Sequence, residues 1–175
     1  NGIRYLTFDS FDAQVIHAVF TRRGGVSPSP WTALNLGGTV GDDPERVREN
    51  RAMAFAVLGR DPASLDDVWQ VHGNDVVVAE APRPPEMPYR QADIVLTDQP
   101  LVTLMMRFAD CVPILFYHPA HRAVGIAHAG WLGTVRGVAG TAVEAMCRRF
   151  GTRLEDLRAA IGPSIGPDHY EVGAD

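Results

Sequence analysis

The fold is decided by the run Val112-Pro113-Ile114-Leu115-Phe116-Tyr117-His118 and by Ala123-Val124-Gly125-Ile126-Ala127-His128, which follows it after a short turn. A run of consecutive apolar residues is typical of a strand that is buried on both faces. The stretch from Gly133 or Thr134 to Phe150 then carries an apolar stripe at helical spacing, and the glycine after it is a stop signal. We therefore predict two strands of a buried sheet, followed by one long helix that packs against it.

Shorter signals on either side predict further strands and a second helix. Asp43-Pro44 is a helix start, because Asp is a good N-cap and Pro fits the first helical position, and Gly59 marks the end of that helix. Four prolines in residues 81–88 exclude a helix or a central strand there, so we expect an exposed loop. His118 and His121 flank a proline and are expected to be exposed turn residues. The other predicted strands lie within residues 1–23, in the segment that ends at His72, and at residues 76–78, 92–98, 101–106 and 159–161.

The composition limits the compartment and the partners. The chain has 175 residues, of which 46% are apolar, and this is enough to bury the core of one domain. A net charge of −5 argues against nucleic acid or an anionic membrane as the main partner, since either requires a basic surface. There is no signal-peptide pattern and no apolar run of membrane length, and the only cysteines are Cys111 and Cys147. We expect a cytoplasmic protein that is a monomer or a homodimer.

Three metal-binding side chains each stand at the end of an apolar run. His72 and His128 close their runs, and Cys111 follows its run through a short turn. Two imidazoles and a thiol are donors that Zn²⁺ prefers, and a catalytic zinc keeps a fourth position open for water or substrate. If the runs are strands of one sheet, the three side chains meet at its edge as a metal site or as a Cys/His catalytic pair. The alternative is two hydrogen-bonded core histidines and a buried thiol.

A turn-rich loop near the N-terminus carries two cations, in Thr21-Arg22-Arg23-Gly24-Gly25-Val26-Ser27-Pro28. Its glycines allow positive φ and a close approach of the backbone to a ligand. Together with Arg22 and Arg23, such a loop could hold a phosphate group through backbone N–H groups and guanidinium forks. A simple surface turn is the alternative.

Six phrases of the chain occur in the order in which a known family has them. They are Thr21-Arg22-Arg23-Gly24-Gly25-Val26-Ser27, Asn35-Leu36-Gly37, Gln70-Val71-His72-Gly73, Ala109-Asp110-Cys111-Val112-Pro113, His128-Ala129-Gly130-Trp131, and Ile161-Gly162-Pro163 with Tyr170-Glu171-Val172-Gly173. On these phrases the chain resembles the laccase-domain proteins, which are also called multicopper polyphenol oxidases, peptidoglycan editing factors and zinc-dependent purine nucleoside phosphorylases. The resemblance extends from about Arg22 to the last residue.

The resemblance implies an α/β (α+β) fold of layered mixed β-sheets flanked by helices, with residues 1–175 as a single catalytic domain. It also implies a zinc ion at the positions of His72, Cys111 and His128, with copper as the less favoured cofactor. The implied activity is phosphorolysis of adenosine, inosine and methylthioadenosine, together with deamination of adenosine. The expected partners are therefore a purine nucleoside and phosphate. Zinc with these ligands lowers the pKa of a bound water towards neutral. The resulting hydroxide could attack C6 of adenine in the deamination.

Further residues are given roles around this site. Phosphorolysis needs a phosphate dianion beside C1′ of the ribose, and the two arginines of the glycine loop are candidates to hold it. Asp110 is a candidate to orient a ligand histidine or to act as an acid or base, next to Cys111 and His128 as catalytic groups; a turn-capping role is its alternative. Asn35 is a candidate either to hydrogen-bond the substrate or to fix its own turn. Trp131 is a candidate either to stack on the base or to pack in the interior.

Three departures from the family's pattern affect these expectations. Leu132 stands where the family usually has Arg or Lys, so phosphorolysis is expected to be weak if that cation binds phosphate. His169 stands where Cys is common, and we expect it at the rim of the site. Members usually continue beyond the Tyr-Glu-Val-Gly phrase, whereas this sequence stops at Asp175. The chain is therefore expected to lack a C-terminal helix and strand.

Three other functions fit parts of the same pattern. Cys111 and His128 could be the nucleophile and base of an amide hydrolase that edits peptidoglycan precursors, and such an enzyme would work in the presence of a chelator. A copper-dependent polyphenol oxidase would need more histidines than the six of this chain. A non-catalytic metal-binding module would hold zinc without turning over any nucleoside.

Overall fold

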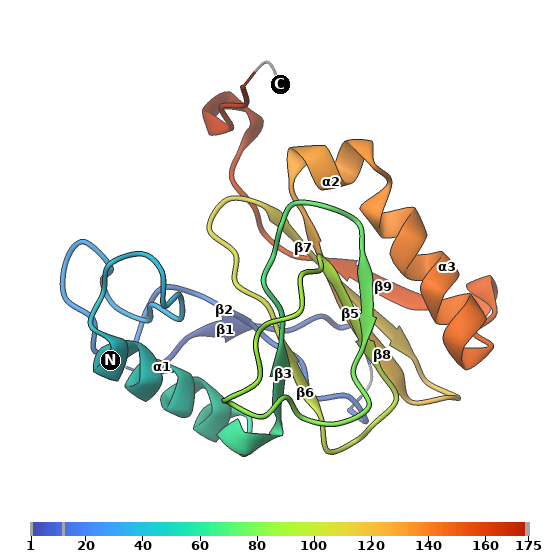
Figure 1. Ribbon diagram of the computed structural model, residues 1–175, viewed down its shortest axis with the longest axis horizontal. Helices are drawn as coiled ribbons and strands as arrows, with labels where there is room; N and C mark the ends of the chain where they lie inside the picture. The colour runs from blue at the N-terminus through green and yellow to red at the C-terminus, as the bar shows by residue number, and fades with distance from the viewer. Residues whose placement is uncertain (1, 12, 174–175) are drawn as a thin grey trace. The chain divides into compact units, whose positions relative to one another are not determined.

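The computed structural model describes residues 2–11 and 13–173 of the chain. These residues fall into two compact units, unit 1 within Asn1–Asp9 and Ala13–Ala63 and unit 2 within Ser10–Asp12 and Ser64–Asp175. Figure 1 labels most of the helices and strands. In the described part of the chain, none of the helices combines the length and the apolar character that crossing a membrane requires.

Unit 1 contains a short strand pair, a long loop and one helix. β1 (Tyr5–Leu6) pairs antiparallel with β2 (Val19–Phe20), and α1 spans Pro44–Val57. The helix begins as predicted, because the side chain of Asp43 caps it by accepting the Glu45 N–H. Gly59, with a φ of 62°, follows its end in the left-handed conformation that glycine favours.

The buried side chain of Asn50 ties the loop of unit 1 to α1. Its oxygen accepts the Val26 N–H, and its nitrogen donates to Ser27 Oγ and to the carbonyl oxygens of Ala33 and Asn35. Both polar atoms of a fully buried amide are thus bonded, as burial requires. This anchor fixes the loop that carries the Thr21–Ser27 phrase.

Unit 2 is built on a five-stranded mixed sheet in the order β4-β5-β8-β7-β9. β4 and β5 are parallel and the other neighbours are antiparallel. β7 and β8 are the two apolar runs, and each pairs with a neighbour on both sides, as a strand buried on both faces should. The strands of the sheet are β4 (Val76–Val78), β5 (Ile94–Thr97), β7 (Val112–His118), β8 (Ala123–Ala129) and β9 (Arg158–Ile161). Three short 3₁₀ helices lie outside it in the described residues: η1 (Pro62–Ser64), η2 (Leu154–Asp156) and η3 (Pro167–His169).

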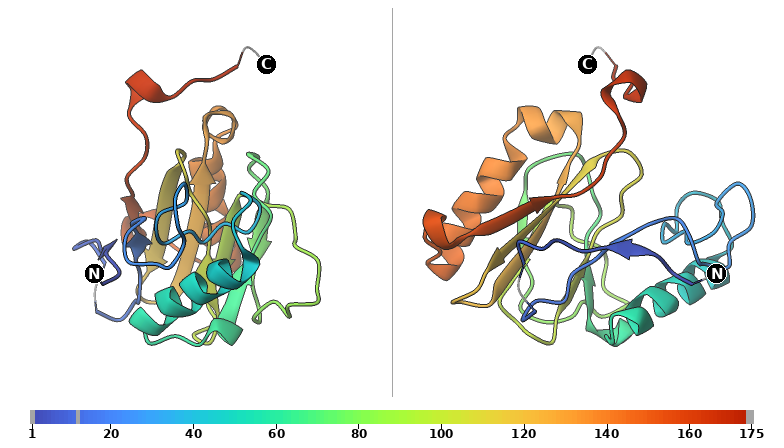
Figure 2. Two further views of the ribbon diagram at one scale, coloured as in Figure 1. Left: turned by 90° about the vertical axis from the view of Figure 1, so that its left-hand side faces the viewer. Right: turned by 180° about the vertical axis from the view of Figure 1, so that it is seen from behind.

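An apolar cluster covers each face of this sheet, whose strands can be followed in Figures 1 and 2. Ile94 and Leu96 of β5 belong to one buried cluster, which includes Met146 of the helix α3 (Val138–Phe150). Val95 points to the opposite face and belongs to a second cluster with Val68. This alternation is what a strand with period two produces when each face has a partner. The predicted α/β fold with layered mixed sheets flanked by helices is confirmed, whereas a single catalytic domain over residues 1–175 stays a prediction.

The strand predicted to end at His72 lies earlier in the chain. It is β3 (Leu65–Asp67), which pairs parallel with β6 (Thr103–Met105), and the residues from Val68 to His72 leave it as an extended loop. The acidic residues Asp66 and Asp67 are fully buried within β3. Two adjacent aspartates do not predict a buried strand, because a charged side chain is buried only when it is paired.

The single long helix predicted after β8 is divided in two. α2 (Trp131–Val135) and α3 are separated by Arg136 and by Gly137, whose φ of 75° breaks the helical path. His118 also differs from its prediction as an exposed turn residue. It is the buried last residue of β7, and its Nδ1 accepts the His121 N–H at 3.1 Å.

An ion network stabilises β3. Arg83 donates to Asp67 Oδ1 at 2.8 Å, and Arg107 donates to Asp67 Oδ2 at 2.7 Å. Asp66 receives both of its hydrogen bonds from Arg90. The two carboxylates can be buried because arginines from two later loops, one between β4 and β5 and one between β6 and β7, pair with them.

Replacing Asp67 by Asn should strongly destabilise unit 2. The change leaves two largely buried guanidinium groups facing a neutral amide, and breaking a buried pair of this kind costs about 3 kcal/mol. Urea unfolding followed by circular dichroism measures the difference. Glu144→Gln is the matched control, because its partner Arg148 is exposed on α3 and should leave the unfolding midpoint unchanged. Equal midpoints for both variants would contradict the role given to the buried network.

Candidate metal centre

His72, Cys111 and His128 come together at one end of unit 2. One donor atom from each, an imidazole nitrogen or Sγ, lies within 4.8 Å of the other two. Cys111 directly precedes β7, His128 lies near the end of β8, and these two strands pair antiparallel. His72 stands on the loop between β3 and β4. Over residues 2–11 and 13–173, this is the one group of three or more His, Cys, Asp or Glu side chains that could hold a metal ion.

The buried carboxylate of Asp93 holds the loop that carries His72. Its oxygens accept the backbone N–H groups of Val71, His72 and Gly73 at 3.1, 3.1 and 2.7 Å. His72 has a φ of 60°, a left-handed conformation that costs a residue other than glycine about 1–2 kcal/mol. Hydrogen bonds from three consecutive amides to one carboxylate offset that cost and fix where the imidazole lies.

The same carboxylate orients the ring of His128. Asp93 Oδ1 lies 2.7 Å from His128 Nδ1, and the Asp93 carbonyl oxygen accepts the His128 N–H at 2.8 Å. An Nδ1–H that is donated to a carboxylate leaves Nε2 with its lone pair, as a metal-binding imidazole requires. Burial alone would raise the pKa of Asp93, but the hydrogen bonds from His128 and from the loop amides outweigh it and hold the pKa below the usual carboxyl value. The group is therefore ionised at neutral pH.

Cys111 contacts the side chain of Tyr170. Cys111 is half-buried, and its Sγ atom lies 3.4 Å from Tyr170 Oη, which also accepts the backbone N–H of Trp131 at 3.1 Å. The hydrogen bond with Cys111, together with burial, raises the pKa of the Tyr170 phenol, so the phenol keeps its proton at neutral pH. Both cysteines of the chain are free thiols, which leaves Cys111 available as a ligand.

Two glycines allow these groups to approach one another. A Cβ atom at Gly130 would lie 3.0 Å from His72 Cδ2 and 3.1 Å from Cys111 Sγ. A Cβ atom at Gly133 would lie 3.0 Å from the carbonyl oxygen of Gly73. The absence of a side chain at Gly133 therefore lets α2 pack closely against the His72 loop.

A second side chain fixes the loop from its other side. Gln70 donates to the Arg107 carbonyl oxygen at 2.8 Å and accepts the Arg107 N–H at 3.0 Å. The guanidinium group of Arg107 in turn pairs with Asp67 of β3, so the loop is joined to the buried ion network. The ring of Phe108 packs beside His128, with 5.5 Å between ring centroids, and makes one wall of the site.

The residues predicted to surround His72, Cys111 and His128 differ in burial. Asp110 is exposed, and Asp93 contacts His128 in the way that was expected of Asp110. Trp131 is half-buried as the first residue of α2, and Leu132 beside it is half-buried too. His169 is exposed in η3.

The other predicted binding residues belong to unit 1. Arg22 donates its Nε–H to the Thr32 carbonyl oxygen at 2.8 Å, and Arg23 is exposed. The amide of Asn35 donates to the Gly37 carbonyl oxygen and to Asp42, and accepts the Gly37 N–H. These contacts correspond to the alternative in which Asn35 fixes its own turn. Roles for these residues in binding phosphate or substrate stay predictions.

Sequence reasoning missed Asp93 and Tyr170. The signal for Asp93 was an acidic residue directly before the apolar run of β5, where a solvated charge is not expected. Tyr170 lies in a phrase that was used only for the family resemblance. Its contact with Cys111 joins residues that are far apart in sequence, and no local pattern reports such a contact.

Comparison with known proteins identifies the family of this chain. A family model described as "Multi-copper polyphenol oxidoreductase laccase" matches residues 16–175. The chain belongs to this family. A protein of Deinococcus radiodurans named purine nucleoside phosphorylase is 43% identical over 161 residues, which cover 92% of this chain and 61% of that protein. The purine nucleoside phosphorylase ORF3 of Streptomyces griseus is 43% identical over 157 residues, which cover 89% of this chain and 63% of that protein.

Solved structures of the family share the fold. The crystal structure of the hypothetical protein YfiH of Bacillus licheniformis matches with a TM-score of 0.82 at 36% identity, over 87% of this chain and 60% of that one. The family resemblance drawn from the six phrases is thus confirmed. The chain spans about three fifths of the length of the curated relatives that it matches.

Asp93→Asn should weaken metal binding by about 10–100-fold, because an amide cannot hold the three loop N–H groups and also accept the His128 Nδ1–H. Asp110→Asn is the matched control and should change the affinity by less than about threefold, since Asp110 is exposed. Titration of each purified variant with Co²⁺ gives the affinities. A loss at Asp110 and none at Asp93 would restore the assignment made from the sequence.

Proposed function

We propose that this protein is a metal-dependent purine nucleoside phosphorylase whose centre is His72, Cys111 and His128. The observation that carries the proposal is the approach of the three donor atoms to within 4.8 Å of one another, with the His72 loop and His128 both held by the buried carboxylate of Asp93. The names of the relatives from Deinococcus radiodurans and Streptomyces griseus support the substrate class. The proposal concerns the whole protein, of which the chain described above would supply the metal centre.

Zinc is the metal we propose for this centre. Two imidazole nitrogens and one thiolate are a donor set of catalytic zinc sites, in which ligand atoms stand about 3.3–3.6 Å apart around a tetrahedral ion. The observed spread of up to 4.8 Å is within reach of small side-chain rotations. Gly130 leaves room next to His72 and Cys111, and His72 is exposed, so a fourth position can face the substrate. A zinc ion bound there would supply a Lewis acid to the reaction.

The donor set favours zinc over several coppers. The part of the chain that the structure describes contains one candidate group of three ligands. A polyphenol oxidase that uses several copper ions requires several groups of histidines. Polyphenol oxidation with several copper ions, the activity in the family description, would therefore need more histidine ligands than these residues supply.

In phosphorolysis a phosphate oxygen forms a bond to C1′ of the ribose while the bond from C1′ to the purine nitrogen breaks. The products are the free purine, which gains a proton, and ribose 1-phosphate. Arg22 and Arg23 are proposed to bind the phosphate dianion, because guanidinium forks in a glycine-rich loop suit that anion. At the centre itself, Asp93 keeps the proton on Nδ1 of His128, so that Nε2 stays free for the metal.

The compartment we propose is the cytoplasm. Cys111 and Cys147 are both unpaired, and free thiols are typical of a reducing compartment. A thiolate ligand would also be lost to oxidation more readily outside the cell.

The purified protein should convert adenosine to adenine and ribose 1-phosphate only when phosphate is present. Chromatography of the products, with and without phosphate, measures this. Inosine formed in both samples would instead identify a deaminase. If neither adenine nor inosine formed in either sample, the proposal would be contradicted.

Cys111→Ala should lose the bound zinc and reduce phosphorolysis at least about a hundredfold, because a required ligand is removed. Cys147→Ala is the matched control, since that thiol lies half-buried on α3 and away from the three ligands. Metal content is measured by mass spectrometry alongside the rate. Full zinc content in Cys111→Ala would refute the ligand assignment, and unchanged turnover in a chelator would favour a thiol nucleophile.

A further inference from the structure

The hydroxyl group of Tyr170 joins three segments at the metal centre. It lies 3.4 Å from Cys111 Sγ and accepts the Trp131 N–H at 3.1 Å. Cys111 stands directly before β7 and Trp131 begins α2, whereas Tyr170 follows η3 near the end of the described chain. The three segments are far apart in sequence, so the fold alone brings them together.

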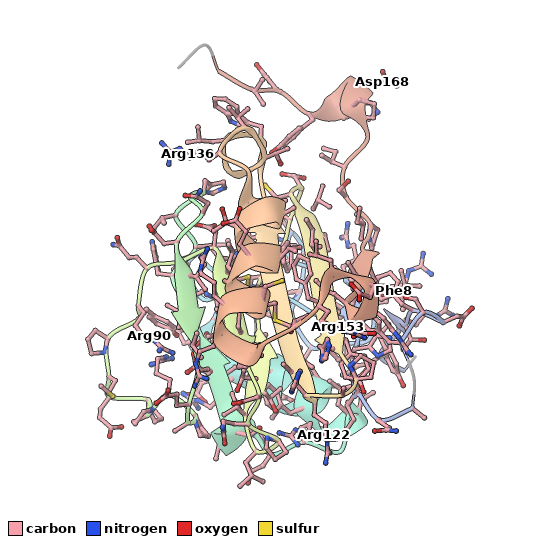
Figure 3. The ribbon with its side chains drawn as sticks, turned by 90° about the vertical axis from the view of Figure 1, so that its right-hand side faces the viewer. Phe8, Arg90, Arg122, Arg136, Arg153 and Asp168 are labelled. Atoms are coloured by element: carbon pink, nitrogen blue, oxygen red, sulfur yellow. The ribbon has the colours of Figure 1, made fainter. Side chains whose placement is uncertain are left out.

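Tyr170 is also an anchor of the segment beyond β9. In residues 163–173 all side chains are exposed except those of Ile165 and Tyr170, which are half-buried. Figure 2 shows the chain leaving β9 and rising past the end of the sheet. Figure 3 shows Asp168 of this segment and Arg136, which follows α2, at the same end of unit 2, opposite Arg122 in the turn between β7 and β8. This is the end at which β7 begins and β8 finishes.

The Tyr170 phenol can donate its proton in a hydrogen bond to only one of its two neighbours, Cys111 Sγ and the backbone nitrogen of Trp131. A phenol has a single O–H and accepts other hydrogen bonds through its oxygen lone pairs. The Trp131 N–H is a donor and therefore occupies a lone pair of Oη. Cys111 as a metal ligand is a thiolate, which can only accept. The O–H of Tyr170 consequently points to Cys111 Sγ.

We propose that Tyr170 is a positioning residue of the metal centre, which donates its O–H to the Cys111 thiolate and links that ligand to the first turn of α2. The proposal rests on the proposed metal site. Hydrogen bonds to a cysteine sulfur reduce its electron density, and groups that contact metal ligands tune the bound metal. The segment of residues 163–173 would thereby contribute a side chain to the metal centre.

Cobalt(II) bound to the full protein tests the contact with the sulfur. A cobalt–thiolate bond absorbs in the near ultraviolet through charge transfer from sulfur, and the energy of that band falls as the sulfur becomes richer in electrons. Tyr170→Phe keeps the ring but removes the O–H, so the band should shift to longer wavelength. Tyr89→Phe is the matched control, because the Tyr89 ring lies under Arg83 at 4.0 Å, and its band should equal that of the wild type.

Hydrogen exchange at the Trp131 amide tests the second contact. In Tyr170→Phe this N–H loses its acceptor, and its exchange should become about tenfold faster, whereas Tyr89→Phe should not change it. Faster exchange with an unmoved cobalt band would show that Tyr170 only braces the backbone, and would overturn the proposal. A wild-type protein that binds cobalt without a sulfur band would overturn the Cys111 assignment itself, so failure of the metal site is distinguishable from failure of the role of Tyr170.

Discussion

The carboxylate of Asp93 is the group on which the site depends. It is fully buried, and it receives hydrogen bonds from His128 Nδ1 and from three consecutive loop amides. A buried charge is tolerated only when all of its hydrogen-bonding capacity is used, so the carboxylate, the loop and the imidazole fix one another. The strand order places Asp93 beside β8, within reach of His128. Two of the three proposed metal ligands, His72 and His128, are held by this single side chain.

That His72, Cys111 and His128 lie close together could be predicted from the sequence, because each stands beside an apolar run. Only Cys111 and His128 adjoin paired strands of one sheet, β7 and β8, whereas His72 stands on a loop. Asp93 could not be assigned in the same way, since its partners are backbone N–H groups, which any sequence has. Asp110 was the more visible acidic residue because it precedes Cys111 in the chain. Asp110 is exposed, whereas the pairing of β5 with β8 brings the buried Asp93 to His128.

The errors in the predicted fold have a similar origin. The strand predicted to end at His72 is β3 (Leu65–Asp67), and its two buried aspartates depend on arginines from distant loops. His118 looked like a turn residue because a proline follows it, but pairing with β8 extends β7 through that position. The helix after β8 has an apolar stripe throughout, and only the left-handed backbone at Gly137 reveals the break. Local patterns identified the elements, and long-range partners decided their boundaries and burial.

The central claim is that two imidazoles and the Cys111 thiolate bind one zinc ion. X-ray absorption at the zinc edge of the purified, zinc-loaded protein tests it most directly. The account predicts one sulfur at about 2.3 Å and nitrogen or oxygen ligands at about 2.0–2.1 Å, with the multiple-scattering pattern of two imidazoles. A zinc shell without sulfur, or with a single imidazole, would contradict it.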